Sequence, residues 1–190
     1  MVFLETLYGR IVPWATNTDI GLLFAVVLCF MTWLLPSATA SLQRLSGMPD
    51  AVLDKRFTYT PDEAYALLSA YGVAGRRRYA RNALMLDLLL PLAYGMFLAL
   101  VGMRVSLWLC MPSGFLRHVS LLPLLAVGFD YLENTSVVIL AWKYPKRMTR
   151  LARLSSTFTS LKWVTVAASV GLIVVGLLLG TLPHQRLCGT

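Results

Sequence analysis

Four ionisable side chains stand inside long apolar stretches of the sequence: Asp87, Asp130, Glu133 and Lys162. A charged group at the centre of a bilayer costs on the order of 2.5–3.5 kcal/mol on insertion scales, so such groups usually face protein or water and have partners. Three carboxyl groups that face one lysine cannot all be ionised comfortably, and a carboxylic acid beside a lysine is suited to acid–base chemistry. The same groups also hold membrane helices together.

The spacing of these residues predicts that they gather on helix faces. Asp130, Glu133 and Asn134 stand at i, i+3 and i+4, so they share one surface of a helix. Pro91 follows Asp87 by four residues, and because proline has no N–H, the backbone carbonyl of Asp87 lacks its helical donor. We therefore predict one intramembrane polar cluster, which contains Asp87, Tyr94, Asp130, Glu133, Asn134, Thr159 and Lys162.

The sequence leaves four roles open for this polar cluster. It could hold the helices together, bind a ligand or lipid headgroup, catalyse a reaction through Asp87, Glu133 and Lys162, or carry protons. A proton path is the weakest of these, because the groups do not form a chain across both leaflets. We take the structural role as the first interpretation, because polar residues commonly hold membrane bundles together.

The composition indicates the elements that position these residues. Of the 190 residues, 57% are hydrophobic and only 14% are charged, whereas soluble domains carry about 25% charged residues. This argues against an ordinary soluble enzyme, a disordered tail and a disulfide-rich secreted module. Four apolar runs come close to the roughly 20 residues that a span requires. We predict an all-α polytopic fold with a single membrane domain over residues 1–190 and spans at about 19–35, 82–103, 115–142 and 157–182.

Basic residues are distributed unevenly among the connections. Twelve of the 17 lysines and arginines lie in the first and third connections, and four lie on the opposite side. By the positive-inside rule, both termini face the exterior, lumen or intermembrane space. The basic excess thus indicates orientation and contact with anionic lipid rather than nucleic acid. The residues predicted to contact anionic headgroups, or to act simply as topology anchors, are Arg76, Arg77, Arg78, Arg81, Lys146, Arg147 and Arg150.

The first connection, residues 36–80, is the one sizeable element predicted outside the membrane. Thr60 is a suitable helix N-cap, Pro61 suits the first helical position, and Glu63 completes a capping box. A short helix with an apolar face should therefore lie on the basic side and stop at Gly72.

The remaining chemistry-bearing residues indicate no cofactor. Cys29, Cys110 and Cys188 have no metal-binding spacing, and two histidines match no zinc motif. The sequence also has no evident nucleotide-binding loop or nucleophile elbow. We expect neither a metal nor an organic cofactor.

Three segments, GVAGRRRYAR, DYLEN and FTSLKW, carry a resemblance over roughly residues 59–170. Together they resemble an uncharacterised family of small four-span integral membrane proteins. That resemblance implies the fold and no particular reaction.

Two functions from different classes follow from this reading. The first is a non-catalytic accessory or scaffold subunit of a larger membrane complex, for example in the mitochondrial inner membrane, with lipid bound at its basic side. Its partners would be anionic membrane lipids and other membrane subunits. The alternative is a small intramembrane lipid- or sterol-modifying enzyme that uses Asp87, Glu133 and Lys162 in a buried pocket.

Overall fold

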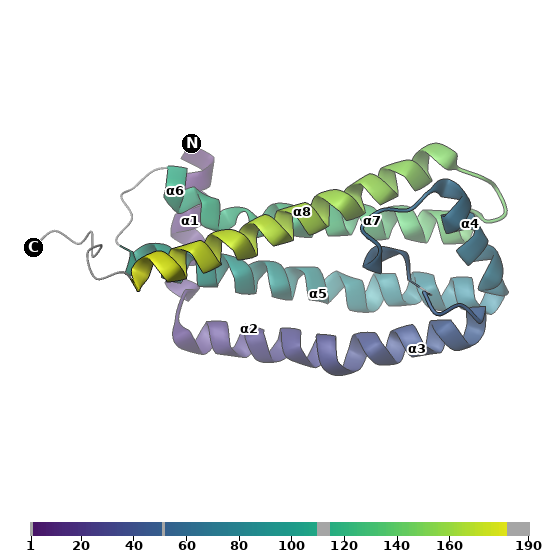
Figure 1. Cartoon of the computed structure of the whole chain (residues 1–190), viewed down its shortest axis with the longest axis horizontal. Coiled ribbons are helices and arrows are strands. Elements are labelled where there is room, and N and C mark those ends of the chain that lie inside the picture. Colours follow the sequence, from purple (N-terminus) through teal and green to yellow (C-terminus); the bar gives the residue numbers. More distant parts are fainter. Residues whose placement is uncertain (1, 51, 110–114, 182–190) are drawn as a thin grey trace, which may run out of the picture.

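The computed structural model describes residues 2–50, 52–109 and 115–181, and within them every regular element is a helix. Four helical stretches are long and apolar enough to cross a membrane: Asn17–Ser46, Gly72–Trp108, Val119–Lys143 and Thr149–Gly180. They run side by side along the long axis of the molecule (Figure 1). The predicted all-α fold with four spans is therefore confirmed.

The first span is longer than predicted because the helix continues through Pro36. It comprises α2 (Asn17–Cys29), a π-helical segment (Phe30–Leu34) and α3 (Leu35–Ser46). The N–H of Leu35 donates to the carbonyl of Phe30, five residues earlier, and this wider turn lets the helix continue through a proline. The span ends at Gly47, whose φ of 68° is the left-handed conformation that glycine adopts readily.

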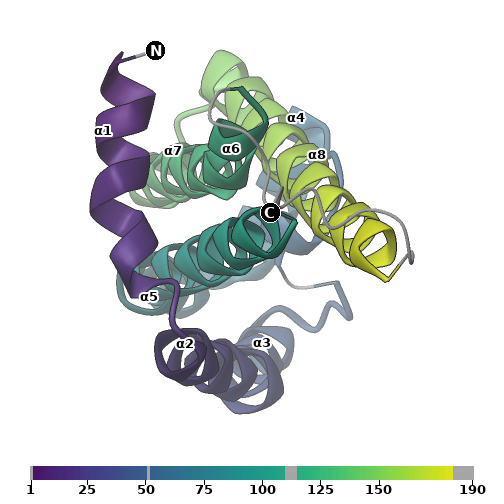
Figure 2. The same cartoon turned by 90° about the vertical axis from the view of Figure 1, so that its left-hand side faces the viewer.

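The other three spans form the centre of the molecule. They are α5 (Gly72–Trp108), α7 (Pro123–Lys143) and α8 (Thr149–Gly180), and α7 packs against both of the others. Gly95 permits the close approach of α5 and α7, because a Cβ there would lie 2.2 Å from Val127 Cγ2. The first span packs mainly on α5, on the side away from α7 (Figure 2).

The other three spans begin at different residues than predicted, and the second also ends later, at Trp108 instead of about residue 103. The second span begins at Gly72 because α5 extends through the basic segment without interruption. The third begins at Val119, since the short helix α6 (Phe115–His118) precedes it. The fourth begins at Thr149, and its predicted end at residue 182 lies outside the described residues.

The first connection folds onto the bundle. After a short 3₁₀ helix (Leu53–Lys55), α4 (Pro61–Ala70) begins with the predicted capping box: the Glu63 N–H donates to Thr60 Oγ1 at 3.2 Å, and the Thr60 N–H donates to Glu63 Oε2 at 2.6 Å. Buried Leu53 and Leu67 join a core formed by α4 with the ends of α5, α7 and α8. The connection is thus part of the folded bundle.

The N-terminal helix α1 (Val2–Ile11) runs across the ends of the long helices that lie away from α4 (Figure 2). Glu5 lies 3.3 Å from Nε2 of the buried His118, and the Tyr8 ring meets the same histidine edge-on. These contacts fix α1 against the segment that precedes α7.

Candidate functional site

An ion-pair network joins α7 and α8 within the membrane. Nζ of Lys162 lies 2.7 Å from Oε2 of Glu133 and 3.5 Å from Oδ1 of Asp130. All three side chains are buried, and Glu133 is 0% exposed. Because removal from water is costly for each charge, these contacts are what make burial of the charges tolerable.

Asp130 connects three helices through its carboxyl group. The hydroxyl of Tyr94 on α5 donates to Oδ2 at 2.8 Å, and the side-chain amide of Asn134 donates to Oδ1 at 3.1 Å. Together with Lys162 on α8, these donors surround the carboxylate. The Asp130 carboxyl thus links α5, α7 and α8 through hydrogen bonds and an ion pair.

Asp87 joins the polar cluster through its backbone. Pro91 is buried inside α5 and cannot donate to the Asp87 carbonyl, so that oxygen accepts a hydrogen bond from the Asn134 amide at 3.3 Å instead. Thr159, also in the predicted cluster, is fully buried on α8 and donates to the backbone carbonyl of Ser155 at 3.0 Å. The structure thus places the predicted residues in one region shared by α5, α7 and α8.

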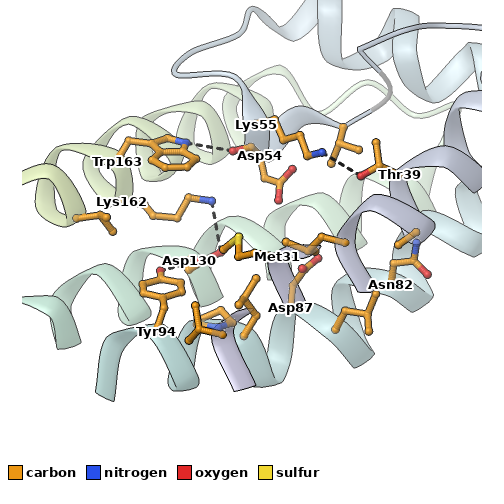
Figure 3. A pocket seen from close by; sticks show the side chains of 18 of the residues that line it. Met31, Thr39, Asp54, Lys55, Asn82, Asp87, Tyr94, Asp130, Lys162 and Trp163 are labelled. Atoms are coloured by element: carbon orange, nitrogen blue, oxygen red, sulfur yellow. Dashed lines mark hydrogen bonds and ion pairs between the residues drawn. The ribbon is translucent and has the colours of Figure 1, made fainter. Parts of the chain in front are cut away.

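A cavity of about 360 Å³ opens beside the polar cluster (Figure 3). Its volume lies in the range of roughly 300–1,000 Å³ that is usual for small-molecule sites. One wall is the first span, which contributes Val27, Met31 and Leu35, and another is α8. Most of the lining is apolar, and its ionisable or hydroxyl groups are Thr39, Asp54, Lys55, Tyr79, Asp87, Tyr94, Asp130 and Lys162. Polar groups inside an apolar cavity are the usual arrangement of a site that orients an amphipathic ligand.

Sequence reasoning missed the segment that brings Asp54 to the cavity. The indole N–H of Trp163 donates to the backbone carbonyl of Asp54 at 3.1 Å, and Tyr79 Oη accepts from the N–H of Leu53 at 3.3 Å. Lys55 Nζ donates to Thr39 Oγ1 at 3.1 Å. These bonds attach the segment to α8, α5 and the first span.

The Asp54 carboxyl lines the cavity, and one of its two oxygens has no partner among the described residues. Its Oδ1 atom is buried and accepts no hydrogen bond from any described residue. Burial raises the pKa of this carboxyl, and the nearby Lys162 opposes that effect. Burial therefore favours the neutral form of the Asp54 carboxyl, and the positive charge of Lys162 favours the ionised form.

Several basic residues that we predicted as headgroup contacts also make contacts within the protein. Arg76 donates to the Leu68 carbonyl at 2.9 Å and lies 4.1 Å above the Tyr144 ring. Arg147 forms an ion pair with Asp62. Arg78 donates to Ser41 at 3.3 Å. Arg76 is half-buried, and the other six predicted headgroup residues are exposed at the same end of the bundle: Arg77, Arg78, Arg81, Lys146, Arg147 and Arg150.

The donor set does not suit a metal ion. Among the described residues, no three histidine, cysteine or carboxylate side chains are grouped as metal ligands. The cavity carboxyl groups are instead spread over its walls.

No protein-family model matches the chain, and neither a curated protein nor a solved structure is similar to it. The resemblance of residues 59–170 to small four-span membrane proteins therefore stays a prediction.

Proposed function

We propose that this integral membrane protein binds an amphipathic molecule of the bilayer, a lipid or a sterol, in the cavity between its first span and α8. The observation that carries this proposal is the mostly apolar cavity whose walls hold Asp54, Asp87, Asp130 and Lys162. A hydrocarbon part fits against the apolar lining of the first span, and a polar group fits beside the carboxyl groups. The ligand is therefore held at both of its chemically distinct ends.

The position of the cavity supports entry from the bilayer. The first span packs mainly on α5, and the cavity is lined on one side by this span and on another by α8. The π-helical turn at Phe30–Leu34 contributes Met31 to the lining, and such turns are frequent at functional sites. A small movement of the first span would be sufficient to admit a membrane molecule.

A second candidate is an enzyme that modifies this bound molecule. It is favoured by the hydrogen-bonded set of Tyr94, Asp130 and Lys162, all of which also line the cavity. Of the three residues predicted as catalytic, Asp87 and Lys162 line it as well. Glu133 is fully buried behind Lys162 and would act by positioning that lysine rather than by touching substrate.

The other roles predicted from the sequence stay proposals. They are service as an accessory or scaffold subunit of a larger complex, a mitochondrial location, and binding of anionic lipid at the basic end. The exposed arginines and lysines at that end support the last of these. We further propose that both termini lie on the opposite side of the membrane, because of the bias in basic residues.

Native mass spectrometry of the protein released from nanodiscs tests the binding proposal. Ala38→Phe places a large side chain in the cavity lining, and Ala25→Phe places the same side chain on the exposed face of the same span. The wild type and Ala25→Phe should retain about one amphipathic molecule per chain, and Ala38→Phe should lose it. Equal retention by the two variants, or no specific molecule on the wild type, would contradict the proposal.

A further inference from the structure

The charges around the cavity are not balanced. Asp54, Asp87 and Asp130 line it, and Glu133 lies directly behind Lys162. Against these four carboxyl groups stand Lys162, which is shared by Asp130 and Glu133, and Lys55, which is exposed and bonded to Thr39. With all groups ionised, negative charge is in excess. Burial opposes that ionisation, and a further positive charge in the cavity would favour it.

Two of the carboxyl groups that line the cavity, those of Asp54 and Asp87, form no ion pair with a described residue, whereas Asp130 and Glu133 share Lys162. Asp54 Oδ1 is buried without a hydrogen-bond partner in the described part of the chain. The Asp87 carboxyl likewise takes part in no ion pair or hydrogen bond with a described residue. The hydrogen bond from Asn134 goes to the backbone oxygen of Asp87 instead. Figure 3 shows these two carboxyl groups, from the first connection and from α5, pointing into the same cavity.

This arrangement selects among the polar groups that a bound molecule could carry. An uncompensated buried carboxylate is costly, and a second negative charge beside it would raise that cost. Phosphate, sulfate and carboxylate headgroups are therefore disfavoured in the cavity. A metal ion fits poorly as well, because the described carboxyl groups do not gather as metal ligands and the lining is mostly apolar.

An organic cation satisfies both features of the cavity. It supplies positive charge to Asp54 and Asp87, and its alkyl substituents tolerate apolar surroundings. Trp163 and Tyr94 also line the cavity, and aromatic rings attract ammonium groups that lie within reach.

We infer, on the basis of the proposed function, that the molecule bound in the cavity carries an amine or quaternary ammonium group placed between Asp54 and Asp87. Its hydrocarbon part lies along the wall formed by Val27, Met31 and Leu35. This site is separate from the exposed basic residues at the end of the bundle, where anionic headgroups are expected.

Binding of three matched probes in dodecyl maltoside micelles tests this inference. The probes share a twelve-carbon chain and differ in the headgroup: dodecyltrimethylammonium, dodecanol and dodecanoate. The tested variants are wild type, Asp54→Asn with Asp87→Asn, Asp50→Asn and Ala38→Phe. Asp50 is the matched control, since it is an exposed acid of the same connection. The affinity of each probe is corrected for its own partitioning into protein-free micelles.

The cationic probe should bind the wild type at least tenfold more tightly than dodecanol, and dodecanoate should bind least. The double variant should lose this preference, and Asp50→Asn should keep it. The double variant should fold, because it removes unpaired buried charge, and its melting temperature without probe checks this. Two results would overturn the cation inference: equal binding of the cationic and neutral probes, or tighter binding of dodecanoate. If Ala38→Phe still weakens binding of these probes, the cavity proposal remains intact. If Ala38→Phe changes the binding of no probe, both proposals fail.

Discussion

The side-chain amide of Asn134 donates a hydrogen bond to the backbone carbonyl of Asp87, 3.3 Å away, where Pro91 has removed the helical donor. A break in the hydrogen bonding of α5 is therefore compensated by a side chain of α7. Such compensation is what makes a proline acceptable inside a membrane helix. It also fixes the register of the two helices that carry Asp87 and Asp130 to the cavity.

Replacing Asn134 should destabilise the bundle in a way that depends on Pro91. Asn134→Leu leaves the Asp87 carbonyl without its donor and removes one donor from Asp130, at a cost of about 1–3 kcal/mol. In a Pro91→Ala background the helical N–H is restored, so the same replacement should cost less. Thermal unfolding of the four proteins in detergent measures this coupling. Strictly additive effects would show that the carbonyl does not need Asn134.

The ion pair between Lys162 and Glu133 should behave as a coupled unit. Lys162→Met or Glu133→Gln alone leaves buried charge without a partner, which costs about 3–5 kcal/mol in soluble proteins and less in membranes. The double variant should recover part of the loss. Melting temperatures in nanodiscs provide the measurement. Single variants as stable as the wild type would mean that the two charges are solvated separately.

Functional assays of the double variant, Lys162→Met with Glu133→Gln, distinguish a scaffold or binding protein from an enzyme. A scaffold or binding protein should keep its partners or its bound molecule once stability is restored. An enzyme should be stable and inactive, because Lys162 would no longer supply charge to the cavity.

The start of α4 should be sensitive to pH. Hydrogen bonds from the backbone N–H and the hydroxyl of Thr60 lower the pKa of the Glu63 carboxyl. A lowered pKa in the folded state means that this stabilisation is present above the ordinary glutamate value of about 4.3 and is lost as the pH falls through the folded value. Protection of α4 amides in hydrogen exchange should therefore decrease in acid.

Two variants check the role of the capping box. Thr60→Ala should lower the local stability of α4 by about 1 kcal/mol at neutral pH. Glu63→Gln should make amide protection less dependent on acid, because the amide does not titrate. Fast exchange across residues 61–70 in the wild type, unaffected by Thr60→Ala, would show that α4 is not a stable helix in the membrane-bound protein.

The sidedness of the membrane protein can be tested by labelling. Single cysteines at Lys55 and Lys146 should react from one side of sealed vesicles, and a cysteine at Arg10 from the other. All three positions are exposed, and α1 lies at the opposite end of the bundle from the connection that carries Lys55 (Figure 1). Reaction of Arg10→Cys and Lys146→Cys from the same side would contradict the orientation.

The sequence was sufficient to predict four spans and the polar residues that share a helix face, because both depend on local regularities. Hydropathy over about 20 residues identifies a span, and helical spacing places Asp130 and Asn134 on one face. The unpaired carbonyl of Asp87 follows from the chemistry of Pro91 alone. Each of these features requires knowledge of only one helix at a time.

Asp54 could not be predicted, because its position depends on contacts between distant segments. Its bond from Trp163 joins residues 109 positions apart, and nothing in the neighbouring sequence distinguishes it from a solvated loop acid. The contacts of Arg147 with Asp62 and of Arg76 with Tyr144 could not be predicted either, because they also join residues far apart in the sequence. The extension of the first span through Pro36 required a π-helical turn, which the sequence does not signal.

Photolabelling in nanodiscs tests the central claim, an intramembrane cavity that binds an amphipathic molecule, most directly. A twelve-carbon amine with a photoreactive group in its chain should attach to Val27 and Val166, which line the cavity from different helices and are half-buried. Excess dodecyltrimethylammonium should prevent that labelling. Labelling confined to exposed lipid-facing positions such as Leu22 and Leu178, unaffected by the competitor, would contradict the account.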